Sequence, residues 1–261
     1  MPTLRVGVAG ALGRLGRVAC AAIEAADGLT LSAAFARQGG ERLADALRGS
    51  GAAGAGISVV GSGDGSVVID DELGAFVGRG IDVVVDCTVY PVTVDVVRES
   101  IDAGIPAVIG ATGWTDEDLV VLSDRCDEAG VPAMLVPNFS FGAVLMMRFA
   151  AQAARVLPRA EIVELHHDQK RDAPSGTAKL TARRIHDAGA PLPPIHSVRL
   201  PGLVAHQETI FGGTGETLTL RHDTVSRECY GPGIVAAVRA VREQQGLVIG
   251  LDAIVERMVA S

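Results

Sequence analysis

The chain has 261 residues, 48% hydrophobic and 21% charged, so it can bury a sizeable core in one large or two modest domains. Its net charge of -8 argues against nucleic acid or an anionic membrane as a partner. The cysteines contain no C-x-x-C pair, so neither a metal site nor a disulfide framework is supported. No run approaches the ~18 apolar residues of a membrane helix, and the first residues do not resemble a signal peptide. We therefore expect a cytoplasmic protein with reduced thiols.

The chain opens with a strand, a glycine-rich turn and a helix. Leu4 to Ala9 reads as a buried strand, a G-x-x-G-x-x-G turn follows, and apolar residues then recur at helical spacing up to Ala26. This order is the setting of the dinucleotide fingerprint, in which glycine permits a sharp turn and the helix N-terminus attracts the pyrophosphate. We therefore predict cofactor contacts along the turn, from Gly10, Ala11, Leu12, Gly13, Arg14 and Leu15.

The end of the second predicted strand, Leu29 to Phe35, bears on the choice of cofactor. NAD-binding proteins carry an acidic residue there that binds the ribose 2′-hydroxyl. This chain has Ala36-Arg37-Gln38, and Arg37 can pair with a 2′-phosphate. The sequence therefore predicts a preference for NADPH, with NADH also possible. The alternative is that Arg37 is only a surface residue.

Strands alternate with helices as far as residue 140. Further strands are predicted at Ile81–Asp86, Ala107–Ile109 and Ala133–Val136, with a helix from Pro91 to about Ala103. Another helix starts at Thr115, which forms an approximate capping box with Asp118. This alternation implies an α/β fold of the Rossmann type, a doubly wound parallel sheet with helices on both faces. Residues 49–66 are rich in Gly, Ala and Ser and predict a mobile loop.

The pattern changes after residue 140 and predicts an inserted α+β domain. A long helix from Phe141 to about Leu157 is followed by strand-like runs, the last two of which form a hairpin through Gly212–Gly215. These runs are His196–Arg199, Ala205–Phe211 and Glu216–Arg221. Gly231-Pro232-Gly233 is then expected to break the chain before a helix at Ile234–Glu243, and a short segment at Leu251–Val259 to pack back on the first domain. We expect residues 1–138 with 231–261 to bind the dinucleotide, and 139–230 to serve substrate binding and oligomerisation.

The most informative run extends from a strand, Glu161 to Leu165, into His166-His167. Imidazole can deliver a proton near neutral pH, and Lys170 can add a positive charge to the same site. Ser175, Gly176 and Thr177 open a helix predicted at Ala178–Ala188, where unpaired N–H groups make an anion site. A proton donor, a cation and an anion cradle suit a small anionic substrate. The alternative is a solvated charged turn; the remaining histidines are taken as structural or surface residues.

The residues from His166 to Ala178, H-H-x-x-K-x-D-A-P-S-G-T-A, resemble the signature of the dihydrodipicolinate reductases, now called 4-hydroxy-tetrahydrodipicolinate reductases. The resemblance implies that His166 is the general acid and Lys170 a second acid or charge stabiliser. It further implies that the substrate carboxylates are held by His167, Lys170, Gly176 and Thr177, with Ser175 beside them.

The resemblance runs essentially from end to end. Gly110-Ala111-Thr112-Gly113 resembles a G-T-T-G loop along the nicotinamide ribose, with Ala111 in place of a threonine, and Asn138-Phe139-Ser140 matches an N-F-S at the cofactor site. Phe139 is equally compatible with a place in the core. Arg37 is a departure, because the family often has an acidic residue there. On the cofactor side the resemblance implicates Gly110, Ala111, Thr112, Val136, Pro137, Asn138 and Phe139.

The activity implied is NAD(P)H-dependent reduction of a cyclic dicarboxylate on the route to diaminopimelate and lysine. The family is commonly tetrameric through strands of the second domain, and the hairpin from Ala205 to Arg221 offers such an edge, so we expect a homotetramer. Two alternatives are a dinucleotide-sensing protein without turnover and a different dehydrogenase on the same fold.

Overall fold

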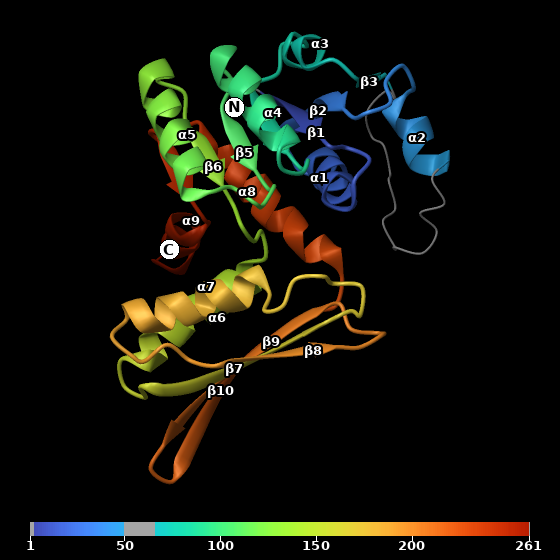
Figure 1. Ribbon diagram of the computed structural model, residues 1–261. Coiled ribbons are helices and arrows are strands. Elements are labelled where there is room, and N and C mark those ends of the chain that lie inside the picture. The colour runs from blue at the N-terminus through green and yellow to red at the C-terminus, as the bar shows by residue number, and fades with distance from the viewer. Residues whose placement is uncertain (1–2, 50–65, 261) are drawn as a thin grey trace. The chain divides into compact units, whose positions relative to one another are not determined.

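The computed structural model describes residues 3–49 and 66–260, and the chain divides into two compact units. The first unit comprises Met1–Phe139 and Tyr230–Ser261, and the second comprises Ser140–Cys229. Figure 1 shows each unit built on its own sheet. Most of the predicted mobile loop, residues 50–65, lies outside the described residues.

The first unit is a parallel sheet whose seven strands follow the order β11-β6-β5-β4-β1-β2-β3. Its strands are β1 (Leu4–Ala9), β2 (Leu29–Phe35), β3 (Ile69–Asp70), β4 (Val83–Asp86), β5 (Ala107–Ile109), β6 (Ala133–Leu135) and β11 (Leu247–Ile249). β4 and β5 are buried throughout and β1 is buried from Val6 to Ala9, as expected where helices cover both faces of a sheet. The predicted doubly wound fold is confirmed, although β3 and β11 were not predicted.

The helices of this unit are α1 (Arg14–Glu24), α2 (Leu43–Gly49), α3 (Leu73–Val77), α4 (Val92–Asp102), α5 (Asp116–Ala129), α8 (Gly231–Val241) and α9 (Asp252–Ala260). Helices α1 and α8 pack against each other, as do α4 and α5. The capping box at the start of α5 is present, because the Thr115 hydroxyl accepts from the Asp118 N–H while the Asp118 carboxylate accepts from the Thr115 N–H. Helix α9 belongs to the first unit, as expected, and buries Ile254 and Val255.

The prediction that Gly231-Pro232-Gly233 breaks the chain is wrong, because these residues form the first turn of α8. Proline is tolerated there since the first turn of a helix needs no intrahelical N–H donor. Gly233 serves close packing instead of chain breaking: a Cβ on it would lie 1.9 Å from the carbonyl oxygen of Phe139.

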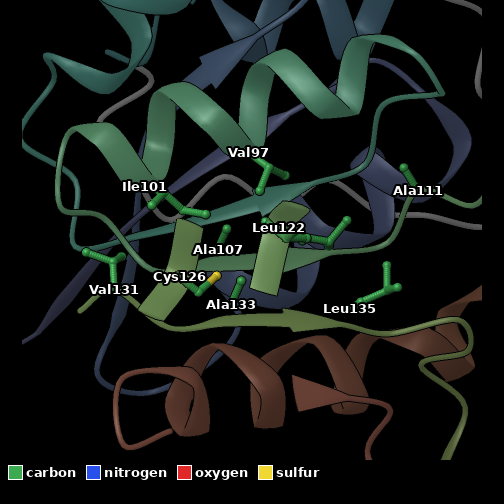
Figure 2. Packing of buried hydrophobic residues seen from close by; sticks show 10 residues of the cluster. Val97, Ile101, Ala107, Ala111, Leu122, Cys126, Val131, Ala133 and Leu135 are labelled. Carbon is green, nitrogen blue, oxygen red and sulfur yellow. The ribbon is translucent and has the colours of Figure 1, made fainter. Parts of the chain in front are cut away.

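The core beneath α4 and α5 is made of small aliphatic side chains. Figure 2 shows Val97 and Ile101 of α4 facing Ala107 of β5 and Ala133 of β6, next to Leu122. Alanine in the strands lets the helices approach the sheet closely. The cluster is therefore closely packed although its buried members include no aromatic side chain. The buried Cys126 thiol belongs to this cluster, and burial raises its pKa to about 11, which fits a packing role.

The second unit is a four-stranded sheet in the order β10-β9-β7-β8, with two helices. Its elements are α6 (Phe141–Ala154), β7 (Arg159–His166), α7 (Gly176–Asp187), β8 (Ile195–Arg199), β9 (Ala205–Gly213) and β10 (Glu216–Thr224). The hairpin of β9 and β10 is confirmed, but its turn is shorter than predicted. Gly212 and Gly213 pair with Thr217 and Glu216 in the ladder, so only Thr214 and Gly215 form the turn.

The helices α6 and α7 pack together and bury one apolar cluster against the sheet, which includes Ile162 of β7 and Phe211 of β9. Within the described residues of both units, no helix combines the length and apolar character needed to cross a bilayer.

We predict that Val97→Ala lowers the free energy of unfolding by about 1.5–3 kcal/mol, because it removes buried methyl groups and leaves a cavity. Val121→Ala is the matched control, since Val121 is a helical valine that is 64% exposed. Both changes alter helix propensity equally, so the difference between them isolates packing. Urea unfolding of the two variants measures it, and equal values would contradict the assigned core.

Candidate functional site

The glycine turn lies where the strand order of the first sheet reverses. Gly10 follows β1 and Cys87 follows the neighbouring strand β4, whereas the chain runs from β1 to β2 on the other side. Gly10 has a φ of +74°, and a Cβ on it would lie 2.6 Å from the Cys87 carbonyl oxygen. A Cβ on Gly16 would lie 2.1 Å from the Gly10 carbonyl oxygen. Only glycines allow this close turn, and such a reversal point is where open α/β sheets bind ligands.

The start of α1 fits the pyrophosphate of a dinucleotide. Helix α1 begins at Arg14 after the exposed Gly13, which offers no side-chain cap, and the first turn holds no acidic residue. Its first N–H groups therefore lack a side-chain acceptor and add to the positive end of the helix dipole. The turn itself is anchored, because the Arg17 Nε donates to the Leu12 carbonyl over 2.9 Å.

A buried carboxylate, which sequence reasoning missed, fixes the loop next to this turn. Asp86 is fully buried at the end of β4 and accepts from the hydroxyls of Thr88 and Thr93, each over 2.5 Å. Burial raises the pKa of Asp86, and these hydrogen bonds oppose the rise. Burial likewise raises the pKa of the Cys87 thiol, so Cys87 is a poor nucleophile in this setting.

The other predicted cofactor residues follow the carboxyl ends of β2, β5 and β6, at the same edge of the sheet as Gly10. A Cβ on Gly110 would lie 2.9 Å from both the Leu15 side chain and the Phe139 ring, so these three residues lie together. Phe139 is only 3% exposed and is a core residue, like Ala111 and Val136. The solvent-accessible members of this predicted set are Arg37, Thr112, Pro137 and, in part, Gly110 and Asn138.

In the second unit, His166 is the last residue of β7 and is held by Glu164. Its Nδ1 lies 2.5 Å from Glu164 Oε2, and the His166 side chain is 14% exposed while that of Glu164 is fully buried. Because side chains alternate along a strand, residues two apart share a face, which brings the carboxylate to the imidazole. His167 lies just beyond the strand end.

Glu164 in turn is paired with Arg199 of the adjacent strand β8. The register sets His166 opposite Arg199, and the guanidinium donates from Nη1 to Oε2 over 2.9 Å and from Nη2 to Oε1 over 2.7 Å. Burial works to raise the pKa of Glu164, but hydrogen bonds from Arg199, Ser197 and His166 outweigh it and hold the pKa below its usual range. Glu164 is therefore a charged acceptor.

Burial lowers the pKa of His166. The Glu164 carboxylate opposes this effect, and the positive charges of Lys170 and Arg199 reinforce it. The neutral imidazole is thus favoured more strongly than in an ordinary histidine. With Glu164 charged, the ring proton lies on Nδ1, which leaves Nε2 as the nitrogen available for proton transfer.

The loop after β7 carries the predicted cation, and the helix after it carries the predicted anion cradle. Lys170 Nζ donates to both oxygens of Asp172, over 2.7 and 2.9 Å. Helix α7 begins at Gly176, two residues before the predicted start, so Gly176 and Thr177 lie in its first turn. The buried Ser175 is its N-cap, and its hydroxyl accepts from the Ala178 N–H over 3.1 Å. This first turn contains no acidic residue, which favours an anion.

Sequence reasoning therefore missed Glu164 and Arg199. The strand alternation that relates Glu164 to His166 was a usable signal. Arg199 offered none, since it meets Glu164 only through the pairing of β7 with β8. The four histidines outside the motif have other partners within the second unit, as expected of structural residues: His186 with the Ala190 carbonyl, His196 with Glu161, His206 with Asp223 and His222 with Ser140.

Two family models together match almost the whole chain, and full-length relatives match it as well. The family described as "Dihydrodipicolinate reductase, N-terminus" matches residues 4–139, and "Dihydrodipicolinate reductase, C-terminus" matches residues 142–255. The 4-hydroxy-tetrahydrodipicolinate reductase of Synechococcus elongatus is 42% identical, with 95% of this chain and 97% of the relative covered. That of Moorella thermoacetica is 40% identical, with 97% and 98% covered.

A solved structure, dipicolinate-bound dihydrodipicolinate reductase from Paenisporosarcina sp. TG-14, is 34% identical with a TM-score of 0.78, covering 97% of this chain and 99% of that one. An amine dehydrogenase from Mycobacterium smegmatis, at 14% identity and a TM-score of 0.66, shares the fold alone. Fold and site together define the class as a pyridine-nucleotide-dependent oxidoreductase. Within that class, the chain belongs to the dihydrodipicolinate reductase family.

We predict that the protein loses stability on acidification just below pH ~6.5, the ordinary pKa of histidine. A folded-state pKa below the unfolded value means that the unfolded chain binds more protons in this range, so stability rises with pH there. His166→Gln should reduce this slope without abolishing it, because burial also lowers the pKa of His222. Urea unfolding at a series of pH values measures the slope, and an unchanged slope in His166→Gln would contradict the assignment.

Proposed function

We propose that this chain catalyses the NAD(P)H-dependent reduction of 4-hydroxy-tetrahydrodipicolinate to tetrahydrodipicolinate, in diaminopimelate and lysine biosynthesis. The main support is that the chain matches reductases of this name over nearly its full length while keeping the complete set of His166, Lys170, Gly176 and Thr177. The related structure from Paenisporosarcina sp. TG-14 is titled as dipicolinate-bound, which favours a cyclic dicarboxylate as the substrate. We place the reaction in the cytoplasm.

In this proposal residues 1–138 with 231–261 bind the nucleotide and 139–230 bind the substrate. The glycine turn from Gly10 to Leu15 would hold the pyrophosphate at the start of α1, and residues that follow β5 and β6 would contact the nicotinamide half of the cofactor. When bound, the reduced nicotinamide supplies the hydride.

The second unit supplies charge and a proton. His167, Lys170, Ser175 and the first-turn N–H groups of Gly176 and Thr177 bind the carboxylates of the substrate. The 4-hydroxyl group of the substrate leaves as water in the overall reaction. As hydride adds to the conjugated imine, electron density collects on the substrate, and His166 in its doubly protonated imidazolium form delivers a proton from Nε2 to that position. Lys170 stabilises the developing charge. A positioned acid of this kind contributes roughly 10²–10⁴ in rate.

We further propose a homotetramer assembled through the sheet of the second unit. Support comes from the hairpin of β9 and β10, which forms one edge of that sheet, with a largely exposed β10 that includes the 40% exposed Leu218. An exposed edge with apolar side chains is a natural pairing surface. Sedimentation of the purified protein tests this assembly.

The activity is tested by adding the freshly made condensation product of pyruvate and aspartate semialdehyde to the protein with NADPH. We expect loss of NADPH absorbance in proportion to the product added. Binding of NADPH without turnover would instead indicate a dinucleotide sensor, and turnover only with other substrates would indicate a different dehydrogenase.

We predict that Lys170→Ala lowers kcat by about 10²-fold or more, because the charge that it stabilises develops during the reaction. NADPH binding should stay nearly unchanged, since Lys170 belongs to the second unit. Lys179 is the only other lysine in the sequence and is exposed on α7, which makes Lys179→Ala the matched control. Steady-state kinetics and NADPH titration check this, and a Lys170→Ala enzyme within a few-fold of the parent would remove the lysine from the mechanism.

We predict that the enzyme prefers NADPH, because Arg37 is exposed directly after β2 in the place where NAD-binding proteins carry an acid. Arg37→Ser should reduce the ratio of kcat/KM for NADPH over NADH by about 10-fold or more, as expected for loss of a charge-assisted hydrogen bond. Arg257→Ser, at an exposed position of α9, should leave the ratio unchanged. An unchanged ratio in Arg37→Ser would mean that Arg37 is only a surface residue and does not contact the cofactor.

A further inference from the structure

The guanidinium of Arg199 connects three segments of the second unit. Its Nη1 and Nη2 donate to the Glu164 carboxylate of β7, as described above. Nη2 also donates to the Asp172 carbonyl over 2.9 Å. Asp172 is the residue whose side chain binds Lys170. One side chain of β8 is therefore in contact with the strand that ends in His166 and with the loop that carries Lys170.

The carboxylate of Glu164 makes the complementary set of contacts. Its Oε2 faces His166 Nδ1, and its Oε1 accepts from the Ser175 N–H over 3.3 Å, at the N-cap of α7. Each oxygen thus accepts from Arg199, and the carboxylate as a whole also accepts from the Ser197 side chain. The ion pair therefore contacts three features of the proposed site: the acid His166, the loop that carries Lys170 and the N-cap of α7.

We propose that Arg199 and Glu164 are positioning residues for the reduction, which hold His166, Lys170 and the first turn of α7 in one fixed arrangement. This inference rests on the proposed function. Neither residue transfers the proton: Glu164 orients the imidazole so that Nε2 is the reactive nitrogen, and Arg199 orients Glu164. The arrangement requires arginine, because Nη1 and Nη2 each donate to a different carboxylate oxygen while Nη2 also reaches the Asp172 carbonyl, and the single nitrogen of lysine cannot make this set of contacts.

A purely structural role makes a different prediction from a positioning role. Buried ion pairs contribute little net stability and can often be replaced by apolar residues as a unit, whereas loss of one partner leaves an uncompensated charge. If the pair served only stability, a double replacement that folds well would also be active. If it serves positioning, activity is lost even when the fold is retained.

The experiment uses the full-length protein with Arg199→Lys, Arg199→Met and the double variant Glu164→Leu with Arg199→Met. Arg199→Lys should lower kcat by about 10- to 100-fold, as expected for a displacement near 1 Å at the reacting groups. NADPH affinity should stay within about twofold, because the first unit is untouched. Arg199→Met should move the pH limb of kcat/KM that reports His166 to higher pH, since a neighbouring positive charge is removed.

The double variant should unfold at a denaturant concentration close to that of the parent and still have the low kcat. Arg125→Lys is the matched control, because Arg125 makes a similar two-pronged pair with Asp102 on the exposed side of α5 and α4, and it should keep parental kinetics. Parental kcat and an unmoved pH profile in the Arg199 variants, or full activity in a folded double variant, would overturn the positioning role. Absence of turnover by the parent protein would instead overturn the proposed function.

Discussion

The second unit depends on burying one negative charge. Glu164 is fully buried, and a carboxylate without a partner would be unstable there. Removing one member of such a pair costs about 3–5 kcal/mol, whereas an exposed pair such as Arg48 with Asp45 contributes about 0–1 kcal/mol. Arg199 must therefore stay within reach of Glu164, and this holds β8 in register with β7. The same requirement fixes the ring of His166, whose Nδ1 faces the carboxylate.

The candidate site of the first unit depends on backbone geometry instead of on a buried ion pair. Gly10 and Gly16 allow main-chain segments to approach each other more closely than any side chain would permit. Asp86 then fixes the beginning of the loop that follows β4 through two threonine hydroxyls. The candidate site of the first unit is thus built from main-chain N–H groups, which suit a pyrophosphate, and that of the second unit from charged side chains, which suit carboxylates and proton transfer.

These two constructions explain what the sequence could and could not predict. Strands β1, β2 and β5 were predicted with their observed ends, because each is a mainly apolar run bounded by turn residues. β3 escaped detection because a run of two residues carries no period of its own, and β11 because it is a partly exposed edge strand without a buried apolar run. The start of α8 was misread, because Gly-Pro-Gly is a breaker by local preference and is overridden here by packing against Phe139. Glu164 could have been found from its spacing to His166, but Arg199 is 35 residues away and is brought close only by strand pairing.

The electrostatics of the second unit also bear on when the acid is charged. Without ligand, burial and two neighbouring cations favour the neutral imidazole of His166, and Lys170 is engaged by Asp172. In the proposed mechanism, a dicarboxylate bound at the first turn of α7 would add negative charge, which would offset the cations and favour the imidazolium. The carboxylates also compete with Asp172 for Lys170, since an ammonium binds any of these oxygens as a point charge. In the proposed mechanism a dianionic substrate would thereby promote the protonated state that its own reduction requires, while Glu164 would keep the ring in the same orientation in both states.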